Sequence, residues 1–141
     1  MTDPAQVLKQ AALYTDARLY RLVSLPPAGI LVAARILAQI NEPFCGLIAD
    51  KDEITLILTE DDAEAFDAHL LDARLSDPLR LLTFDLPLAP DLVGFVALVA
   101  RLLAEGGIPI IPLGAFARDH LLVPAVHFAH AWDILKEYQT A

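Results

Sequence analysis

An internal repeat constrains the fold of this chain more than any other feature of its sequence. When residues 34–67 are aligned without a gap on residues 100–133, eleven of the aligned pairs are identical. These pairs are Ala34/Ala100, Arg35/Arg101, Leu37/Leu103, Ala38/Ala104, Pro43/Pro109, Leu47/Leu113, Ala49/Ala115, Leu56/Leu122, Ala63/Ala129, Ala65/Ala131 and Asp67/Asp133. The preceding strands align at a different offset, so the second strand-to-helix loop is longer. A copy of about 60 residues is marginally stable alone, and we expect the two copies to share buried surface.

Each copy has the pattern of a strand, a helix, two strands and a second helix. The first copy predicts strands at 17–25, 43–49 and 53–59 and helices at 28–40 and 61–71. The second predicts strands at 79–86, 108–113 and 120–123 and helices at 91–105 and 128–138. A short helix after Asp3-Pro4 precedes both copies.

This order predicts an α+β fold of two tandem ferredoxin-like modules, each an antiparallel sheet with helices on one face. We expect an N-terminal module with the leading helix at residues 1–75 and a C-terminal module at 76–141. The pattern leaves open whether the strand at 79–86 completes the first module or begins the second.

Charge and hydropathy exclude two classes of partner. The 141 residues carry 10 Lys and Arg against 19 Asp and Glu, a net charge of −9, which argues against nucleic acid. Although 56% of the residues are hydrophobic, the longest uncharged runs contain prolines and fall short of the roughly 20 residues of a membrane span. The single cysteine, Cys45, and an N-terminus without signal-peptide features favour a cytoplasmic location.

The chain offers little for catalysis. Ser24 and Ser76 lack the glycines of a nucleophile turn, and Cys45, in an expected strand, fits a small core residue. His127 and His130 have no third metal ligand at a supporting spacing. No glycine-rich phosphate loop is present. We therefore expect a protein that is not an enzyme, with no metal and no cofactor.

Two loops of the second copy are the candidate binding site. Residues 87–94 lead from a strand into a helix, where free backbone amides can hold a carboxylate and Gly94 permits close approach. Residues 114–120 place Arg118, Asp119 and His120 beside Phe116. Asp119 could face the ammonium of an amino acid and Arg118 its carboxylate. An ordinary hairpin turn with an Arg–Asp surface pair explains these residues equally well.

The stretch from Asp91 to Ile110, together with Gly114 to Pro124, resembles the ACT domain. It is similar to small bacterial tandem-ACT proteins, related to the ACT pairs of aspartate kinases and of a cytosolic arginine sensor. Their pattern is "VGL", a helix ending "LAE.GI", then "(F/Y)..DH(I/L)(F/L)VP". Its glycine, Asp-His pair and closing proline match Gly94, Asp119, His120 and Pro124. Arg118 and Ala89-Pro90-Asp91 depart from the polar or histidine residue and the serine that the family often has there.

The resemblance implies a regulatory protein that binds an amino acid or another small molecule between two modules. The ligand-binding residues expected from the two loops are Asp91, Leu92, Val93, Gly94, Phe116, Arg118, Asp119 and His120. Of these, Leu92 to Gly94 would act through backbone amides. We expect a homodimer. The alternative is a ligand-free dimeric interaction module held through sheet edges or apolar helix faces.

Overall fold

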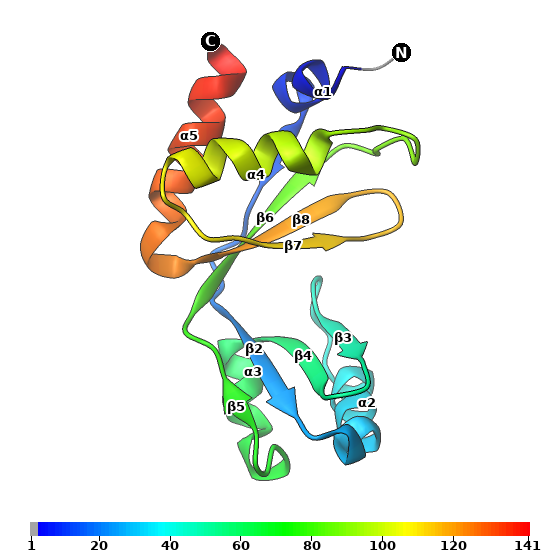
Figure 1. The fold of residues 1–141 in the computed structure, drawn as a ribbon. Helices are drawn as coiled ribbons and strands as arrows, with labels where there is room; N and C mark the ends of the chain where they lie inside the picture. Colours follow the sequence, from blue (N-terminus) through cyan, green and yellow to red (C-terminus); the bar gives the residue numbers. More distant parts are fainter. Residues whose placement is uncertain (1–2) are drawn as a thin grey trace. The chain divides into compact units, whose positions relative to one another are not determined.

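The computed structural model describes residues 3–141, which divide into two compact units (Figure 1). Unit 1 combines the N-terminal segment up to Ala17 with Leu79–Ala141, and unit 2 is Arg18–Pro78. The strand at 79–86 therefore belongs with the C-terminal copy. We expected the leading helix to belong to the N-terminal module, residues 1–75. It packs instead in unit 1, with the C-terminal copy.

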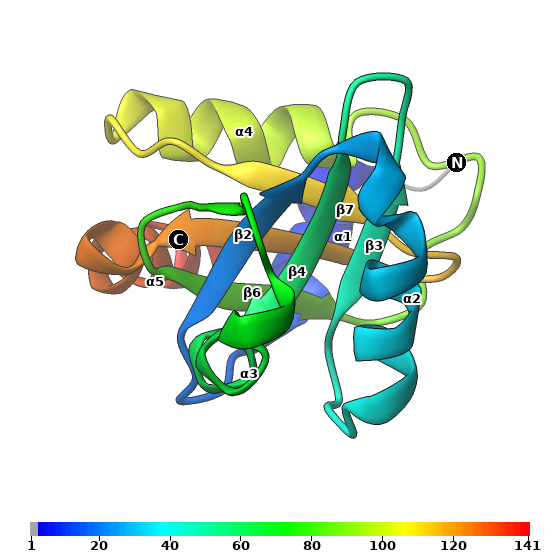
Figure 2. The same ribbon diagram turned by 90° about the horizontal axis from the view of Figure 1, so that it is seen from below.

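Unit 2 is a complete βαββαβ module. Its elements are β2 (Tyr20–Leu25), the 3-10 turn η1 (Pro27–Gly29), α2 (Ile30–Gln39), β3 (Gly46–Ala49), β4 (Ile54–Thr59), α3 (Glu60–Ala65), the 3-10 turn η2 (Asp67–His69) and β5 (Arg74–Leu75). The antiparallel strands lie in the order β3-β4-β2-β5. Both α2 and α3 lie on the same side of the strands (Figure 2). Alternate strand residues such as Val23 and Leu56 pack there against Ala33 and Ile36 of α2.

The second helix of unit 2 is shorter than the expected 61–71. Thr59 caps α3 by accepting a hydrogen bond from the Asp62 amide (3.1 Å), and three acidic residues of the first turn favour the helix start. The chain then turns back through η2 and Asp72, which has a φ of 59°. This turn lets β5 pair with β2, a two-residue strand that the sequence pattern did not predict.

Unit 1 contains the second copy of the same order. Its elements are β6 (Leu79–Asp85), α4 (Phe95–Glu105), β7 (Ile111–Gly114), β8 (Asp119–Pro124), the 3-10 turn η3 (Ala125–His127) and α5 (Phe128–Thr140), joined by α1 (Pro4–Gln10) and β1 (Ala12–Tyr14). The antiparallel order is β1-β6-β8-β7, so β1 takes the place beside β6 that β5 takes beside β2. The N-terminal segment thus supplies the fourth strand of the C-terminal copy.

Helix α1 is fixed to unit 1 by packing and by hydrogen bonds. Asp3 caps it by accepting from the Ala5 amide (3.1 Å), as its sequence predicted. Leu8 is fully buried in a core shared by α1, α4, α5 and the strands. The side-chain amide of Gln139, near the end of α5, donates to the carbonyl oxygens of Leu8 (2.9 Å) and Ala11 (2.6 Å). The first and last elements of the chain are therefore bonded to each other.

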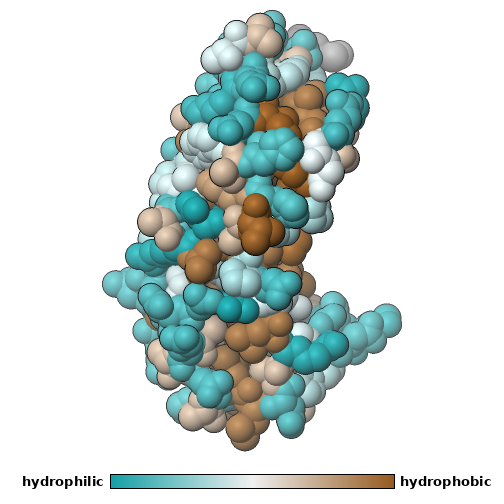
Figure 3. Space-filling model, turned by 90° about the vertical axis from the view of Figure 1, so that its left-hand side faces the viewer, coloured by the Kyte–Doolittle hydropathy of each residue, from teal (hydrophilic) through white to brown (hydrophobic). Residues whose placement is uncertain are grey.

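Some large hydrophobic side chains of the protein are exposed. Figure 3 shows hydrophobic residues interspersed among hydrophilic ones on one face. The large hydrophobic side chains that are most exposed are Leu31, Leu71, Val93, Phe116 and Val126. Among residues 3–141, no helix has the length and apolar character needed to cross a membrane.

Candidate functional site

The loop before α4 is longer than the sequence pattern predicted. The helix begins at Phe95, not at Asp91, and its N-cap is Gly94 in the left-handed region at a φ of 90°. The Leu92 amide donates to the Ala89 carbonyl (3.0 Å) in a turn that contains Pro90. Leu92 is therefore not the free donor that was expected. The first intrahelical bond runs from Leu98 to Gly94 (2.9 Å), so the amides of residues 95–97 stand at the open end of the helix.

The two loops predicted from the sequence lie together in unit 1. The Leu88 amide donates to the Ala117 carbonyl (2.7 Å) and joins the loop before α4 to the β7–β8 hairpin. The hairpin turn is closed by a hydrogen bond from Ala115 to Arg118 (2.9 Å). Between the loops lies a cavity of about 340 Å³, which we call the main cavity. It is lined by Leu88, Ala89, Pro90, Leu92, Gly94, Phe95, Val96, Ala97, Ala115, Phe116, Ala117, Arg118 and Asp119.

Five of the eight predicted site residues line the main cavity: Leu92, Gly94, Phe116, Arg118 and Asp119. Asp91, Val93 and His120 are not among its lining residues. The Phe116 side chain, one of the expected ligand-binding residues, is fully exposed at the hairpin tip. The backbone amides of Val96 and Ala97 were missed, because the loop length depends on the turns at Pro90 and Gly94.

Asp119 and Arg118 carry opposite charges, and their surroundings differ. Burial raises the pKa of the Asp119 carboxyl above its ordinary value of 3.8, and the adjacent His120 partly opposes this shift. The Arg118 Nε donates to Asp85 Oδ1 (2.9 Å) in an ion pair with both side chains substantially exposed. The carboxylate of Asp119 is therefore partly withdrawn from water.

His120 makes a separate interaction across the sheet. Its Nδ1 lies 2.8 Å from Thr83 Oγ1, and the two residues are cross-strand partners on β8 and β6. Successive strand residues point to opposite faces, so this pair lies on the face opposite to the Asp119 side chain. Burial lowers the pKa of His120 below 6.5; Asp119 opposes the shift and Arg118 adds to it. The ring is accordingly neutral in most molecules at pH 7.

A second, smaller cavity of about 120 Å³ adjoins the main cavity beneath α4. We call it the inner cavity. It is lined by Phe84, Phe95, Val96, Val99, Pro112, Leu113, Gly114, Asp119, His120 and Leu121. Three of these, Phe95, Val96 and Asp119, also line the main cavity. The two spaces therefore share a wall that carries the Asp119 carboxylate.

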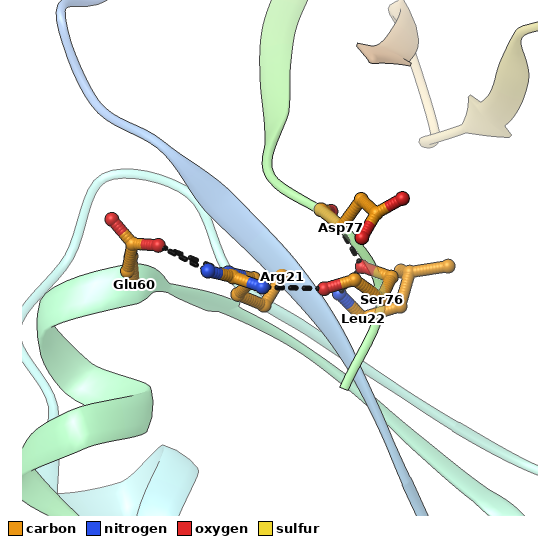
Figure 4. Close-up of polar contacts among 5 residues, drawn as sticks. All are labelled: Arg21, Leu22, Glu60, Ser76 and Asp77. Atoms are coloured by element: carbon orange, nitrogen blue, oxygen red, sulfur yellow. Dashed lines mark hydrogen bonds and ion pairs between the residues drawn. The ribbon is translucent and has the colours of Figure 1, made fainter. Parts of the chain in front are cut away.

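Unit 2 has its own cavity of about 270 Å³, lined by Arg21, Glu60, Ala63, Glu64, Asp67 and Leu75. Its only cationic lining residue is already engaged, as Figure 4 shows: Arg21 donates to Glu60 Oε1 (2.5 and 3.1 Å) and to the Ser76 carbonyl (2.7 Å). Ser76 also accepts a hydrogen bond from the Leu22 amide through its hydroxyl (2.9 Å). These contacts hold the segment after β5 onto β2. An arginine in a mostly apolar strand is the sequence signal that points to this cluster.

The structure corrects one expectation about a reactive side chain. Cys45 is exposed immediately before β3, so its prediction as a small core residue is wrong; the strand begins only at Gly46. In the part of the chain that the structure describes, no three His, Cys, Asp or Glu side chains are grouped as metal ligands.

No protein-family model matches the sequence, and no curated protein does. Several solved structures are similar. Protein Atu0741 from Agobacterium tumefaciens has a TM-score of 0.72 at 25% identity, over 90% of this chain and 87% of that one. VC0802 from Vibrio cholerae, a protein of unknown function described as a possible transport protein, has a TM-score of 0.73 at 21% identity, over 96% and 94%. The regulatory subunit of aspartate kinase from Thermus flavus has a TM-score of 0.68 at 13% identity, over 91% and 97%. The chain therefore has the α+β fold of the tandem ACT regulatory domains of aspartate kinase.

Proposed function

We propose that unit 1 binds a free amino acid in the main cavity and that the protein acts as a regulatory, non-catalytic binding module. The observation that carries this proposal is the position of the Asp119 carboxylate in one cavity with the open N-terminus of α4. An α-amino acid has an ammonium and a carboxylate on one carbon. The two features of the cavity have the charges that complement these groups.

Asp119 would bind the ammonium. Its raised pKa reflects the cost of holding a carboxylate partly out of water. A cation within hydrogen-bond distance would stabilise the charged form, and such charge-assisted hydrogen bonds are the stronger kind. The favourable pairing is therefore available to a ligand.

The amides of residues 95–97 would bind the carboxylate, because the N-terminus of a helix carries unpaired N–H groups and the positive end of the helix dipole. Arg118 would remain paired with Asp85 and hold the hairpin beside β6. A bound amino acid would then link α4 to the β7–β8 hairpin. A ligand that binds one arrangement of these loops more tightly shifts the population toward it, and this is the regulatory mechanism we propose.

Titration calorimetry with each of the twenty amino acids tests this function. We expect at least one to bind the wild type, Asp119→Asn to abolish binding, and Asp91→Asn to retain it, because Asp91 lies outside the cavity lining. Binding by Asp119→Asn with unchanged affinity would contradict the proposed site. If no amino acid binds and the molecular mass shows a stable dimer, the ligand-free interaction module is correct, a reading that the exposed Leu31 and Phe116 favour.

A further inference from the structure

The inner cavity adjoins the main one, and most of its lining residues are apolar. Seven of its lining residues are apolar: Phe84, Phe95, Val96, Val99, Pro112, Leu113 and Leu121. Phe84 and Phe95 meet edge to face at a centroid distance of 5.1 Å and form a firm wall. Val99, on the underside of α4, is 1% exposed. Most of the surface that an occupant would contact is therefore hydrocarbon.

Two of the residues that line the inner cavity, Asp119 and His120, have polar side chains. Asp119 also lines the main cavity, whereas the His120 ring is hydrogen-bonded to Thr83 on the opposite face of the sheet. The remaining walls offer no charged side chain. A polar group that entered would lose its hydrogen bonds to water without finding partners, whereas a hydrocarbon group would lose nothing.

The volume of the inner cavity further restricts which side chains can occupy it. Its volume of about 120 Å³ is close to that of cavities, about 150 Å³, that stay dry and bind benzene when they are lined by Leu, Ile and Phe. A branched side chain of three or four carbons is of this scale. The extended side chain of a lysine or an arginine would place its charge among the apolar walls.

We infer that the inner cavity is the side-chain subsite of the proposed amino-acid site and that the ligand is a branched aliphatic amino acid of the size of valine or leucine. This inference rests on the proposed function. Asp119, at the junction of the two cavities, would hold the ammonium in the main cavity while the side chain enters the inner one. The ammonium, the carboxylate and the side chain on the α-carbon would then each have a separate place. The site would therefore distinguish the two mirror-image forms of the amino acid as well as its size.

Calorimetry with matched ligands measures this preference. Each methylene buried contributes about fourfold in affinity, so valine should bind at least tenfold more tightly than alanine. Valine should also exceed its isostere threonine about tenfold, because the threonine hydroxyl would be buried without a partner. Leucine should likewise exceed asparagine. If an amino acid binds but threonine or asparagine equals its apolar counterpart, the inference is wrong while the proposed function stands. If none binds, both are wrong.

Substitutions at Val99 test the location of the subsite. Val99→Phe fills the inner cavity and should shift the preference toward alanine, whereas Val99→Ala enlarges it and should shift the preference toward leucine and phenylalanine. Leu98→Ala is the control, since Leu98 lies on the same helix and lines neither cavity. Should Val99→Phe fail to fold, the Val99→Ala result decides alone. An order of ligand affinities that is the same in Val99→Ala as in Leu98→Ala would overturn the inference.

Discussion

The attachment of the N-terminal segment to the last helix can be tested at Gln139. Its side-chain amide makes hydrogen bonds of 2.9 and 2.6 Å to the carbonyl oxygens of Leu8 and Ala11, two buried residues at the end of α1. Gln139→Glu keeps the shape of the side chain but replaces the donor with a carboxylate oxygen, which cannot donate to a carbonyl. Each lost hydrogen bond costs about 1 kcal/mol, and a carboxylate oxygen placed beside the two carbonyl oxygens adds repulsion, although the Leu8 carbonyl still accepts from the Ala11 amide (3.3 Å). We expect a loss of about 2 to 3 kcal/mol in the free energy of unfolding.

Urea denaturation and amide hydrogen exchange measure this effect. The loss should appear as a lower urea midpoint, and exchange should accelerate in β1, which α1 and Gln139 hold against β6. Exchange in β4 should change little, because β4 belongs to unit 2.

The neighbouring Thr140 supplies the control. Its hydroxyl donates only to carbonyls of its own helix, at Lys136 and Glu137 (both 3.2 Å), and it is exposed. Thr140→Ala should change stability by less than about 0.5 kcal/mol. The reasoning fails if Gln139→Glu is as stable as Thr140→Ala, or if exchange accelerates equally in β1 and β4.

Two further predictions concern unit 1. Gly94→Ala should lower the free energy of unfolding by about 1 to 2 kcal/mol, because Gly94 has a φ of 90°, which strains a residue with a side chain. Crowding is not the cause, since the nearest atom to an added Cβ, in Pro4, is 3.7 Å away. An unchanged urea midpoint would contradict this. The folded-state pKa of His120 is lowered, so the unfolded state takes up the proton first as the pH falls below 6.5, and stability is lost from there down to the folded-state value. His120→Gln should therefore lose less stability than the wild type between pH 7 and pH 5 in parallel urea titrations; equal losses would show that another group controls this range.

Elements with a strong periodic pattern were predictable from the sequence. Helix α2 was expected at 28–40 and spans Ile30–Gln39, and β8 was expected at 120–123 and spans Asp119–Pro124. Short strands were not, because β1 and β5 have three and two residues and too few positions to show alternation. Their existence depends on pairing with β6 and β2, which are distant in sequence.

The candidate site was predictable in its loops but not in its detail. Asp119 was identified from its charge beside an aromatic residue, and the structure places it in the main cavity. Which backbone amides face that cavity depends on where α4 begins, and Asp91 has the properties of a good cap. The turn that ends at Gly94 moves the helix start four residues along the chain, to Phe95. Local preference at Asp91 is thus overridden by loop geometry.

The pairing of β1 with β6 restricts the order in which the parts of the chain can fold during synthesis. Unit 2 is contiguous, so all of its residues are present once Pro78 has been made. Residues 3–17 are made before unit 2, yet their partners β6, α4 and α5, including Gln139 of α5, follow it in the sequence. The apolar face of α1, with Val7 and Leu8, therefore stays without its native cover until unit 2 and then α4 and α5 have been made. A segment that is made before unit 2 can therefore be buried only after unit 2 is complete.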